Sequence, residues 1–134
     1  GRDVAFLASG TGITPMMAML RQYLREGSGH AHLILGEKRE ETIIYRETLN
    51  ELAANNPDLD ITFVLSDPNP EWIGRIGYAQ EHLEDLFDAF TERDFYVCGV
   101  PPMVVQTKAR LAELGAPDER IHSEGWEDSA VADD

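Results

Sequence analysis

The chain has 134 residues, the size of one ordinary domain. Hydrophobic residues make up 43% of it, which is enough for a packed core and argues against bulk disorder. The 25 Asp and Glu residues outnumber the 11 Lys and Arg residues, so the formal net charge is −14. Such a surface repels phosphate backbones and anionic lipids, which argues against binding to nucleic acid or to a membrane surface.

The composition also bears on the environment of the protein. Only two of the 11 cationic residues are lysines, Lys38 and Lys108. Acidic residues dominate the predicted helix surfaces, a pattern typical of halophilic proteins, in which high ionic strength screens the self-repulsion. An acidic protein from an ordinary mesophile is the alternative interpretation.

The sequence shows no sign of secretion or membrane insertion. Its single cysteine, Cys98, cannot form an intrachain disulfide. No apolar run approaches the roughly 20 residues that a membrane span needs, and no signal peptide is visible. We therefore expect a cytoplasmic protein. The sequence starts at Gly1, without a methionine and directly before an apolar segment, so we expect it to be one domain of a longer protein.

Segments typical of strands and of helices alternate along the chain. In chain order, we predict a strand at 4–8, a helix over 15–26, a strand at 31–35, a helix over 43–54, a strand at 60–65, a helix over 77–90, a strand at 94–98, a helix over 101–114 and a strand at 120–123. Loops rich in Gly, Pro, Asn and Asp separate them. This alternation predicts an α/β fold, a five-stranded parallel sheet with helices on both faces.

In such sheets the ligand lies at the carboxyl ends of the strands. The first strand is followed by Gly10-Thr11-Gly12-Ile13-Thr14-Pro15. The two glycines let backbone N–H groups turn toward an anion, and the dipole of the next helix adds to the attraction, which predicts a phosphate or pyrophosphate site. The motif is neither a Walker A loop nor the usual Gly-x-Gly-x-x-Gly, because Pro15 takes the place of the third glycine. A plain strand-to-helix turn is the alternative.

A second motif, Cys98-Gly99-Val100-Pro101-Pro102-Met103, follows the strand at 94–98. We expect the cysteine at the last strand position to face the cleft. The glycine permits close approach of another backbone, and the prolines suit the first turn of a helix. By itself, the cysteine also fits a buried apolar thiol.

Taken together, the two motifs resemble the nicotinamide-nucleotide domain of the ferredoxin–NADP reductase superfamily, which includes flavodoxin reductases, oxygenase reductase components and flavohaemoglobin reductase domains. The resemblance covers roughly residues 2–128 in matching order. Further matches are Gly36-Glu37-Lys38 after the second strand, Ser66 after the third, Gly77-Tyr78 before a helix, and the ending Glu124-Gly125-Trp126. The resemblance implies a Rossmann-like NAD(P)-binding oxidoreductase domain over 1–128, followed by an acidic tail at 129–134.

The resemblance also implies a role for each matching position. The turn at 10–15 would approach the pyrophosphate and the nicotinamide ribose. Cys98 and Gly99 would lie beside the nicotinamide, and Pro101 and Met103 would shape the cofactor groove. The other cofactor-binding positions would be Gly36, Lys38, Ser66, Asp67 and Tyr78, the last three around the adenosine.

In this family the hydride passes to FAD, which is held mainly by a separate β-barrel domain, and the electrons continue to an acceptor such as a ferredoxin or an oxygenase. The flavin-binding signature of that domain is absent here, so we expect this chain to supply half of an active site. Trp126 would shield the flavin, with Glu124 near its N5 edge; together with Cys98 they form the expected catalytic set. Packing of Trp126 against its own domain is the alternative.

A nucleotide-binding regulatory or electron-relay module without turnover is the alternative function. No metal site is expected, because His30 and His32 have no third ligand at metal spacing.

The segment after the third strand bears on the choice of nucleotide. NADP-selective relatives have Ser-Arg there, whereas this chain has Ser66-Asp67. A carboxylate repels a 2′-phosphate but accepts a hydrogen bond from a free ribose hydroxyl, which favours NAD(H) over NADP(H). Arg75 and Lys38 are the alternative partners of a phosphate at this end.

The net charge of −14 generates a prediction about salt. The thermal unfolding temperature should rise steeply from dilute buffer to molar KCl, because ions screen repulsion between charges farther apart than a Debye length of about 10 Å at 0.1 M. Thermal melts followed by circular dichroism across a KCl series measure this. A flat profile would contradict the halophilic interpretation and leave the predicted fold untouched.

Overall fold

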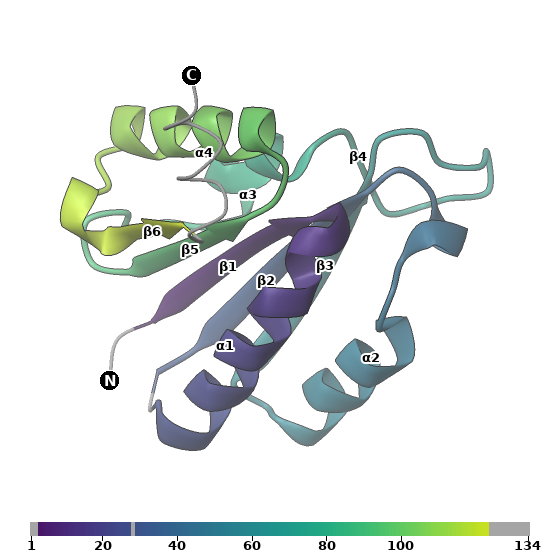
Figure 1. The fold of residues 1–134 in the computed structure, drawn as a ribbon, viewed down its shortest axis with the longest axis horizontal. Coiled ribbons are helices and arrows are strands. Elements are labelled where there is room, and N and C mark those ends of the chain that lie inside the picture. Colours follow the sequence, from purple (N-terminus) through teal and green to yellow (C-terminus); the bar gives the residue numbers. More distant parts are fainter. Residues whose placement is uncertain (1–2, 28, 124–134) are drawn as a thin grey trace.

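The computed structural model describes residues 3–27 and 29–123, which form three layers (Figure 1). Within this part of the chain, six parallel strands form one sheet in the order β4-β3-β2-β1-β5-β6. The strands are β1 Val4–Ser9, β2 Ala31–Glu37, β3 Leu59–Leu65, β4 Arg75–Ile76, β5 Asp94–Cys98 and β6 Ile121–Ser123. The α-helices are α1 Ile13–Glu26, α2 Arg46–Asn55, α3 Leu83–Leu86 and α4 Pro101–Glu113. Among the described residues, no helix is long and apolar enough to cross a bilayer.

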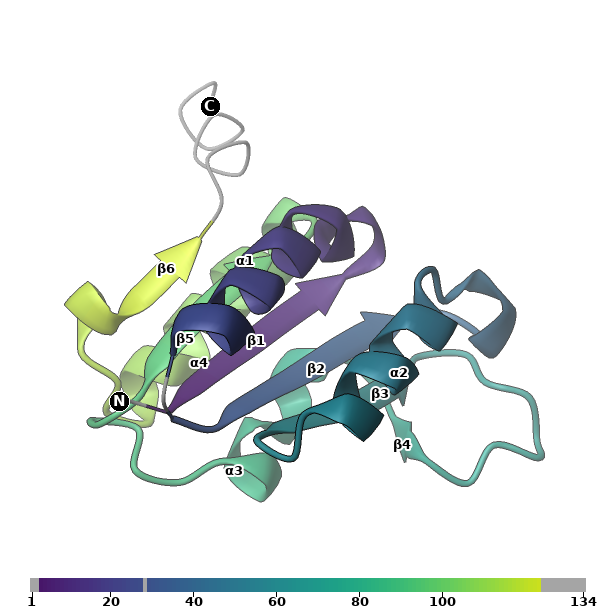
Figure 2. The ribbon, with the colours of Figure 1, turned by 90° about the horizontal axis from the view of Figure 1, so that it is seen from below.

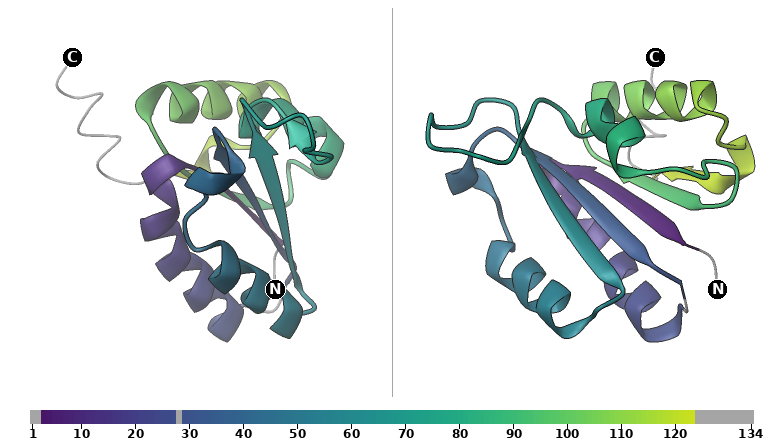
Figure 3. Two further views of the ribbon diagram at one scale, coloured as in Figure 1. Left: turned by 90° about the vertical axis from the view of Figure 1, so that its right-hand side faces the viewer. Right: turned by 180° about the vertical axis from the view of Figure 1, so that it is seen from behind.

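Side-chain alternation along the buried strands divides the core into two halves. In β1, Val4, Phe6 and Ala8 pack on the side of α1 and α2, whereas Ala5 and Leu7 pack on the side of α3 and α4. Figures 2 and 3 show these two helix pairs on opposite faces of the sheet. The helices contribute Ile13, Met16, Met17, Leu20 and Leu49 to the first half, and Leu83, Met103, Val104 and Leu111 to the second. The prediction of a parallel sheet with helices on both faces is confirmed.

The direction in which the sheet grows changes at β1. From β1 the chain adds β2, β3 and β4 on one side, and then returns to place β5 on the other side of β1. The segments that follow β1 and β5 therefore leave toward opposite faces of the sheet. In parallel sheets this divergence opens a crevice at the carboxyl ends of the two strands, where ligands bind.

The predicted helix over 77–90 is only partly present, and only its residues 83–86 are α-helical. A 3-10 turn, Ala79–His82, leads into the single turn of α3. The backbone then leaves the helical region, because Phe87 is extended at φ −130° and Ala89 is left-handed at φ +50°. The buried Phe87 ring packs edge-on against Phe95, so the apolar spacing of this segment reflects burial of a short turn.

The five predicted strands are all present, and β4 is an addition. It has only two residues and pairs with the last two residues of β3, so it is too short to show a periodicity in the sequence. The second strand was predicted to end before Gly36, but β2 continues through Gly36 and Glu37. Gly36 keeps parallel partners in both neighbouring strands, Ser9 in β1 and Val64 in β3.

His32 of β2 is held in an environment that favours its neutral form. Burial lowers the pKa of its imidazole below the ordinary 6.5, and the nearby Asp60 carboxylate offsets part of this effect. Its Nε2 lies 2.8 Å from Thr62 Oγ1 on β3, and its ring meets the Phe87 ring edge-on, with 5.2 Å between the centroids. Folding therefore disfavours the uptake of a proton at this site.

This environment predicts a pH dependence of stability. Above pH 6.5 the imidazole is neutral in both the folded and the unfolded state. Below pH 6.5 the unfolded chain takes up a proton that the folded chain resists, so the contribution of His32 to the free energy of unfolding is lost as the pH falls through the folded pKa. Between pH 7.5 and 5.5 the free energy of unfolding should fall less in His32→Gln than in the wild type. Urea unfolding at several pH values measures this. His30→Gln is the control, and equal pH slopes for the wild type and His32→Gln would contradict the assignment.

Candidate functional site

The two long helices beside the crevice begin without acidic residues. The first turns of α1 and α4 contain no Asp or Glu, and neither helix has a side-chain cap at its start. By contrast, α2, α3 and the 3-10 turns Glu40–Thr42, Ala79–His82 and Asp118–Arg120 each carry at least one acidic residue in the first turn. In a chain of net charge −14, this distribution leaves the positive ends of the α1 and α4 dipoles open to an anion.

The two helix starts differ in what they offer a ligand. Pro101 and Pro102 occupy the first positions of α4 and have no N–H groups, so they present ring surface. α1 directly continues the 3-10 turn Gly10–Gly12 and has no proline at its first two positions, so this helix start keeps its backbone N–H groups. The start of α1 is therefore suited to a phosphate group, and the start of α4 to an apolar or ring-shaped part of a ligand.

The backbones that follow β1 and β5 touch at Gly12. A Cβ atom at this position would lie 2.5 Å from the carbonyl oxygen of Cys98 and 2.8 Å from the nitrogen of Gly99. Gly99 is equally confined, because a Cβ there would collide with Ser9 Oγ and lie 3.0 Å from Met103 Sδ. Only glycine allows this approach, which brings the two predicted motifs into direct contact at the crevice.

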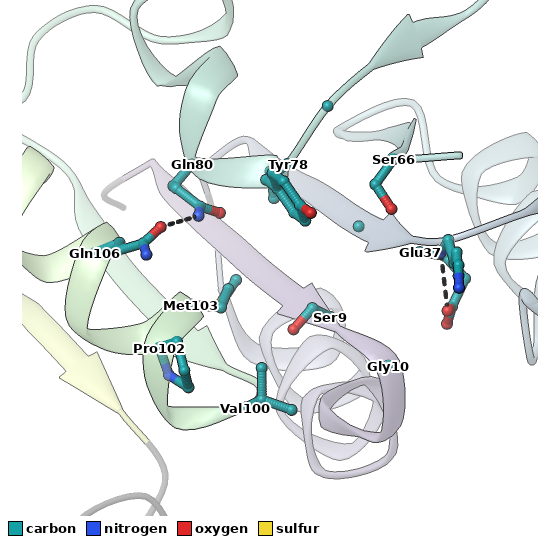
Figure 4. Close-up of a pocket in the computed structure, with 14 residues that line it drawn as sticks. Ser9, Gly10, Glu37, Ser66, Tyr78, Gln80, Val100, Pro102, Met103 and Gln106 are labelled. Atoms are coloured by element: carbon teal, nitrogen blue, oxygen red, sulfur yellow. Dashed lines mark hydrogen bonds between the residues drawn. The ribbon is translucent and has the colours of Figure 1, made fainter. Parts of the chain in front are cut away.

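A cavity of about 490 Å³ opens beside this contact, at the carboxyl ends of β1, β2 and β3 (Figure 4). Its walls come from the ends of β1 and β2, the segments after β3 and β4, and the start of α4. The lining residues are Ser9, Gly10, Gly36, Glu37, Lys38, Ser66, Gly77, Tyr78, Ala79, Gln80, Val100, Pro102, Met103 and Gln106. Its volume is in the range of small-molecule and cofactor sites, roughly 300–1,000 Å³.

Two buried polar atoms of the lining lack a hydrogen-bond partner within the described structure, Ser9 Oγ and Gln80 Oε1. The Gln80 amide is held in place by its Nε2 group, which donates to Gln106 Oε1 at 2.8 Å. A buried polar group without a partner costs about 1–3 kcal/mol. A ligand with hydroxyl or amide groups would relieve this cost, so the lining fits a polar guest such as a nucleotide.

The far end of the cavity is suited to a base and its sugar. Tyr78 is 59% exposed and lines the cavity, so its ring can stack on a planar base. Its backbone N–H donates to Glu81 Oε1 at 2.7 Å, which fixes the start of the following turn. Ser66 and Lys38 lie at the same end and provide a hydroxyl and a cation.

Asp67 follows Ser66 but does not line the cavity. Its carboxylate is paired with Arg39, whose Nη2 lies 3.0 Å from Asp67 Oδ2. Arg75, expected as an alternative cation at this end, contacts Asp85 at 3.2 Å and His82 Nδ1 at 3.1 Å instead. The cation beside Asp67 is therefore Arg39, which the sequence analysis did not single out.

The structure places the predicted site residues in three groups. Those that line the cavity are Gly10, Gly36, Lys38, Ser66, Tyr78 and Met103. Those that lie beside it, in the turns and helix starts, are Thr11, Gly12, Ile13, Thr14, Pro15, Asp67, Gly99 and Pro101. The Cys98 thiol is only 1% exposed and belongs to the core on the α1 side, so it does not line this cavity. Glu124 and Trp126 lie outside the described residues.

Eight of the lining residues were not among the predicted site residues, and three of them illustrate how the sequence signals differ. Ser9 ends the first strand, so the rule that ligands lie at strand ends could have identified it. Gln80 comes two residues after the predicted Tyr78 and shares its turn. Gln106 lies in the second turn of α4, and no local pattern connects it with the other segments.

The histidines of the described chain pair with individual neighbours. His30 Nε2 lies 2.8 Å from Asp60 Oδ2, and His82 Nε2 lies 3.0 Å from the carbonyl oxygen of Ile76. Among the described residues, no group of three or more His, Cys, Asp or Glu side chains converges on a possible metal position.

A parallel sheet with a crevice at β1 and β5, a glycine turn and an acid-free helix start defines a nucleotide-binding α/β domain. The family described as "Oxidoreductase NAD-binding domain" matches residues 6–109. The chain belongs to this family, which confirms the resemblance carried by the two glycine motifs. It is thus an NAD-binding domain of the oxidoreductase class.

Individual relatives agree with this assignment. The chain is 37% identical over 131 residues to "Ferredoxin--NADP reductase B" of Sorangium cellulosum. This alignment covers 91% of this chain and 53% of that protein. It is 35% identical over 124 residues to the "3-ketosteroid-9-alpha-monooxygenase, ferredoxin reductase component" of Mycolicibacterium smegmatis, with 91% of this chain and 33% of that protein covered. The chain thus spans about half and a third of the lengths of these two relatives.

Solved structures show the same fold. The CS-b5R domains of human Ncb5or in the NAD+ form superpose with a TM-score of 0.81 at 32% identity, over 91% of this chain and 36% of that one. The ferredoxin NADP+ reductase of Neisseria gonorrhoeae, solved with bound FAD and NADP, superposes with a TM-score of 0.78 at 23% identity, over 92% of this chain and 56% of that one.

The contact at Gly12 generates a mutational prediction. Gly12→Ala should lower the free energy of unfolding by about 1–3 kcal/mol, because the new methyl group must push the two loops apart. Gly36→Ala is the matched control: its Cβ would lie 3.5 Å from Ala79 Cβ, an ordinary contact, so its stability should change little. Urea unfolding followed by circular dichroism measures both. Equal stability of the two variants would show that the loops do not touch at Gly12.

Proposed function

We propose that this chain binds NAD(P)H and presents the nicotinamide to FAD held mainly by a separate β-barrel domain, and that the electrons continue to a ferredoxin, an oxygenase or another acceptor. The binding domain would comprise residues 1–128, and 129–134 would be an acidic tail. The observation that carries the proposal is the acid-free start of α1 beside the cavity, in a chain whose α2 and α3 carry acidic residues in their first turns.

The described residues divide the work of holding the dinucleotide. The N–H groups at the start of α1 and the Gly10 turn would hold the pyrophosphate. Tyr78 and Ser66 would hold the adenosine, and the Ser9 hydroxyl and the Gln80 amide oxygen would bond to polar groups of the ligand. When bound, the nicotinamide supplies a hydride and the flavin accepts it. The part played by this chain is positioning, which lowers the entropic cost of the transfer.

The nicotinamide end would lie toward β5. Val100, Pro102 and Met103 provide the apolar wall of the cavity there. Gly99 allows close approach of a ring, and the backbone of Cys98 is held against Gly12. We propose that Cys98 lies beside the reacting ring through this position at the end of β5. Glu124 and Trp126 would act at the flavin, the tryptophan covering its face when no nicotinamide is present.

We also propose that NAD(H) is favoured over NADP(H). Asp67 directly follows Ser66 at the adenosine end of the cavity, and its backbone N–H donates to the carbonyl oxygen of Lys38 at 2.9 Å. A carboxylate held there repels a 2′-phosphate and accepts a hydrogen bond from a free 2′-hydroxyl group. Of the two competing cations considered from the sequence, Arg75 is engaged with Asp85 and His82, whereas Lys38 lines the cavity.

The test is a calorimetric titration of the chain with NADH and, separately, with NADPH. We expect one site, with tighter binding of NADH. In a second assay, the chain with added FAD and a dye acceptor should show no NADH-dependent dye reduction. A longer protein, expressed with the residues encoded upstream of this chain in its gene, should reduce the dye.

Each outcome bears on one part of the proposal. Absence of binding by either nucleotide would overturn the whole proposal. Dye reduction by this chain alone would overturn the division of the active site between two domains. Nucleotide binding without dye reduction in the longer protein would favour a regulatory or electron-relay module. Tighter binding of NADPH would overturn the proposed preference alone.

A further inference from the structure

Next to the adenosine end of the cavity, Asp67 forms an ion pair with Arg39. A preference for NAD(H) inferred from Asp67 alone leaves this arginine out. Arg39 contacts Asp67 Oδ2 with two nitrogens, Nη2 at 3.0 Å and Nε at 3.3 Å. Both bonds end on the same oxygen, so Oδ1 takes no part in this pair. The pair therefore neutralises the carboxylate while leaving one oxygen for a hydroxyl group of a ligand.

The position of the pair follows from the main chain. The backbone N–H of Ser66 donates to the carbonyl oxygen of Glu37 at 3.0 Å, and that of Asp67 donates to Lys38 at 2.9 Å. These bonds hold the segments after β2 and β3 side by side. Lys38 and Ser66 line the cavity, and each is followed at once by one member of the pair. Arg39 and Asp67 thus lie together at the rim, next to the lining.

We propose that Arg39 is a specificity-determining residue: it tempers the discrimination that Asp67 exerts against a ribose 2′-phosphate. This inference rests on the proposed function, because it assumes that adenosine occupies this end of the cavity. A bare carboxylate repels a phosphate as a full charge. A carboxylate paired with a guanidinium acts as a dipole, whose field falls off faster with distance, so the paired protein rejects the phosphate less strongly than an unpaired Asp67 would.

The exposure of the pair sets the size of the effect. The two side chains are 49% and 57% exposed, so water and salt screen the interaction. We therefore expect Arg39 to change the selectivity by about fivefold to tenfold, as for charges a few ångströms apart at a protein surface. The effect should shrink in molar salt. The ion pair contributes little to folding, so its variants should fold normally.

The experiment measures binding of two adenosine nucleotides that differ only at the 2′ position, adenosine 5′-monophosphate and adenosine 2′,5′-bisphosphate. Neither needs a nicotinamide or a flavin, and calorimetry on the full chain gives both dissociation constants. In Arg39→Gln, the affinity for the bisphosphate should fall about fivefold to tenfold, while that for the monophosphate stays within about twofold. Asp67→Asn should shift the ratio in the opposite direction, because it leaves Arg39 free to bind the phosphate.

Two control variants separate the pair from other effects of charge. Arg39→Lys keeps the cation and should retain most of the wild-type ratio. Arg25→Gln removes one positive charge from an exposed position in the last turn of α1, and the ratio should not change. If Arg25→Gln shifts the ratio as much as Arg39→Gln does, overall charge rather than the pair sets the selectivity, and the inference is wrong.

The remaining outcomes distinguish this inference from the proposed function. If the wild type binds neither adenosine nucleotide nor NADH, the proposed function fails. If it binds them but Arg39→Gln weakens both adenosine nucleotides equally, or neither, then Arg39 does not act at the 2′ position. In that case the inference fails while the proposed function stands.

Discussion

The close approach of Gly12 to the backbone of Cys98 and Gly99 is the contact on which the site depends. It joins the ends of β1 and β5, the two strands where the sheet changes direction, and brings the start of α1 to the edge of the cavity. A side chain at Gly12 would separate the loops, because the opposing atoms are main-chain atoms that cannot rotate away. The positions of Ser9 and Met103 follow from the same contact.

The distribution of acidic residues along the chain also favours an anionic ligand at this site, although the chain as a whole is strongly acidic. Acidic residues occupy the first turns of α2 and α3, where they stabilise the helix dipole, yet they are absent from the first turns of α1 and α4. The open dipole of α1 lies beside a cavity whose lining contains Lys38. An anionic ligand is thus attracted locally while the protein as a whole carries a net charge of −14.

The predictable parts of the fold were those with long, regular patterns. Largely apolar runs marked the central strands β1, β2 and β5, because a parallel sheet covered on both faces buries most of their side chains. The segment 77–90 failed for the opposite reason: its apolar residues bury a short turn, and the left-handed Ala89 is not evident in the pattern. In the site, Gly10, Tyr78 and Met103 were found because they belong to contiguous motifs. Gln106 was not, since its partner Gln80 is 26 residues away.

The sequence by itself determined the fold class, the family and the two glycine motifs, because each depends on residues close together along the chain. The tertiary structure decided which residues from other parts of the chain contact the side chains of the site. It placed the Cys98 thiol in the core, turned Arg75 toward Asp85, and paired Asp67 with Arg39, 28 residues away. These outcomes depend on which strand ends lie side by side and on which face of the sheet each side chain points. Strand register and order set both, and a single sequence does not encode them in any local pattern.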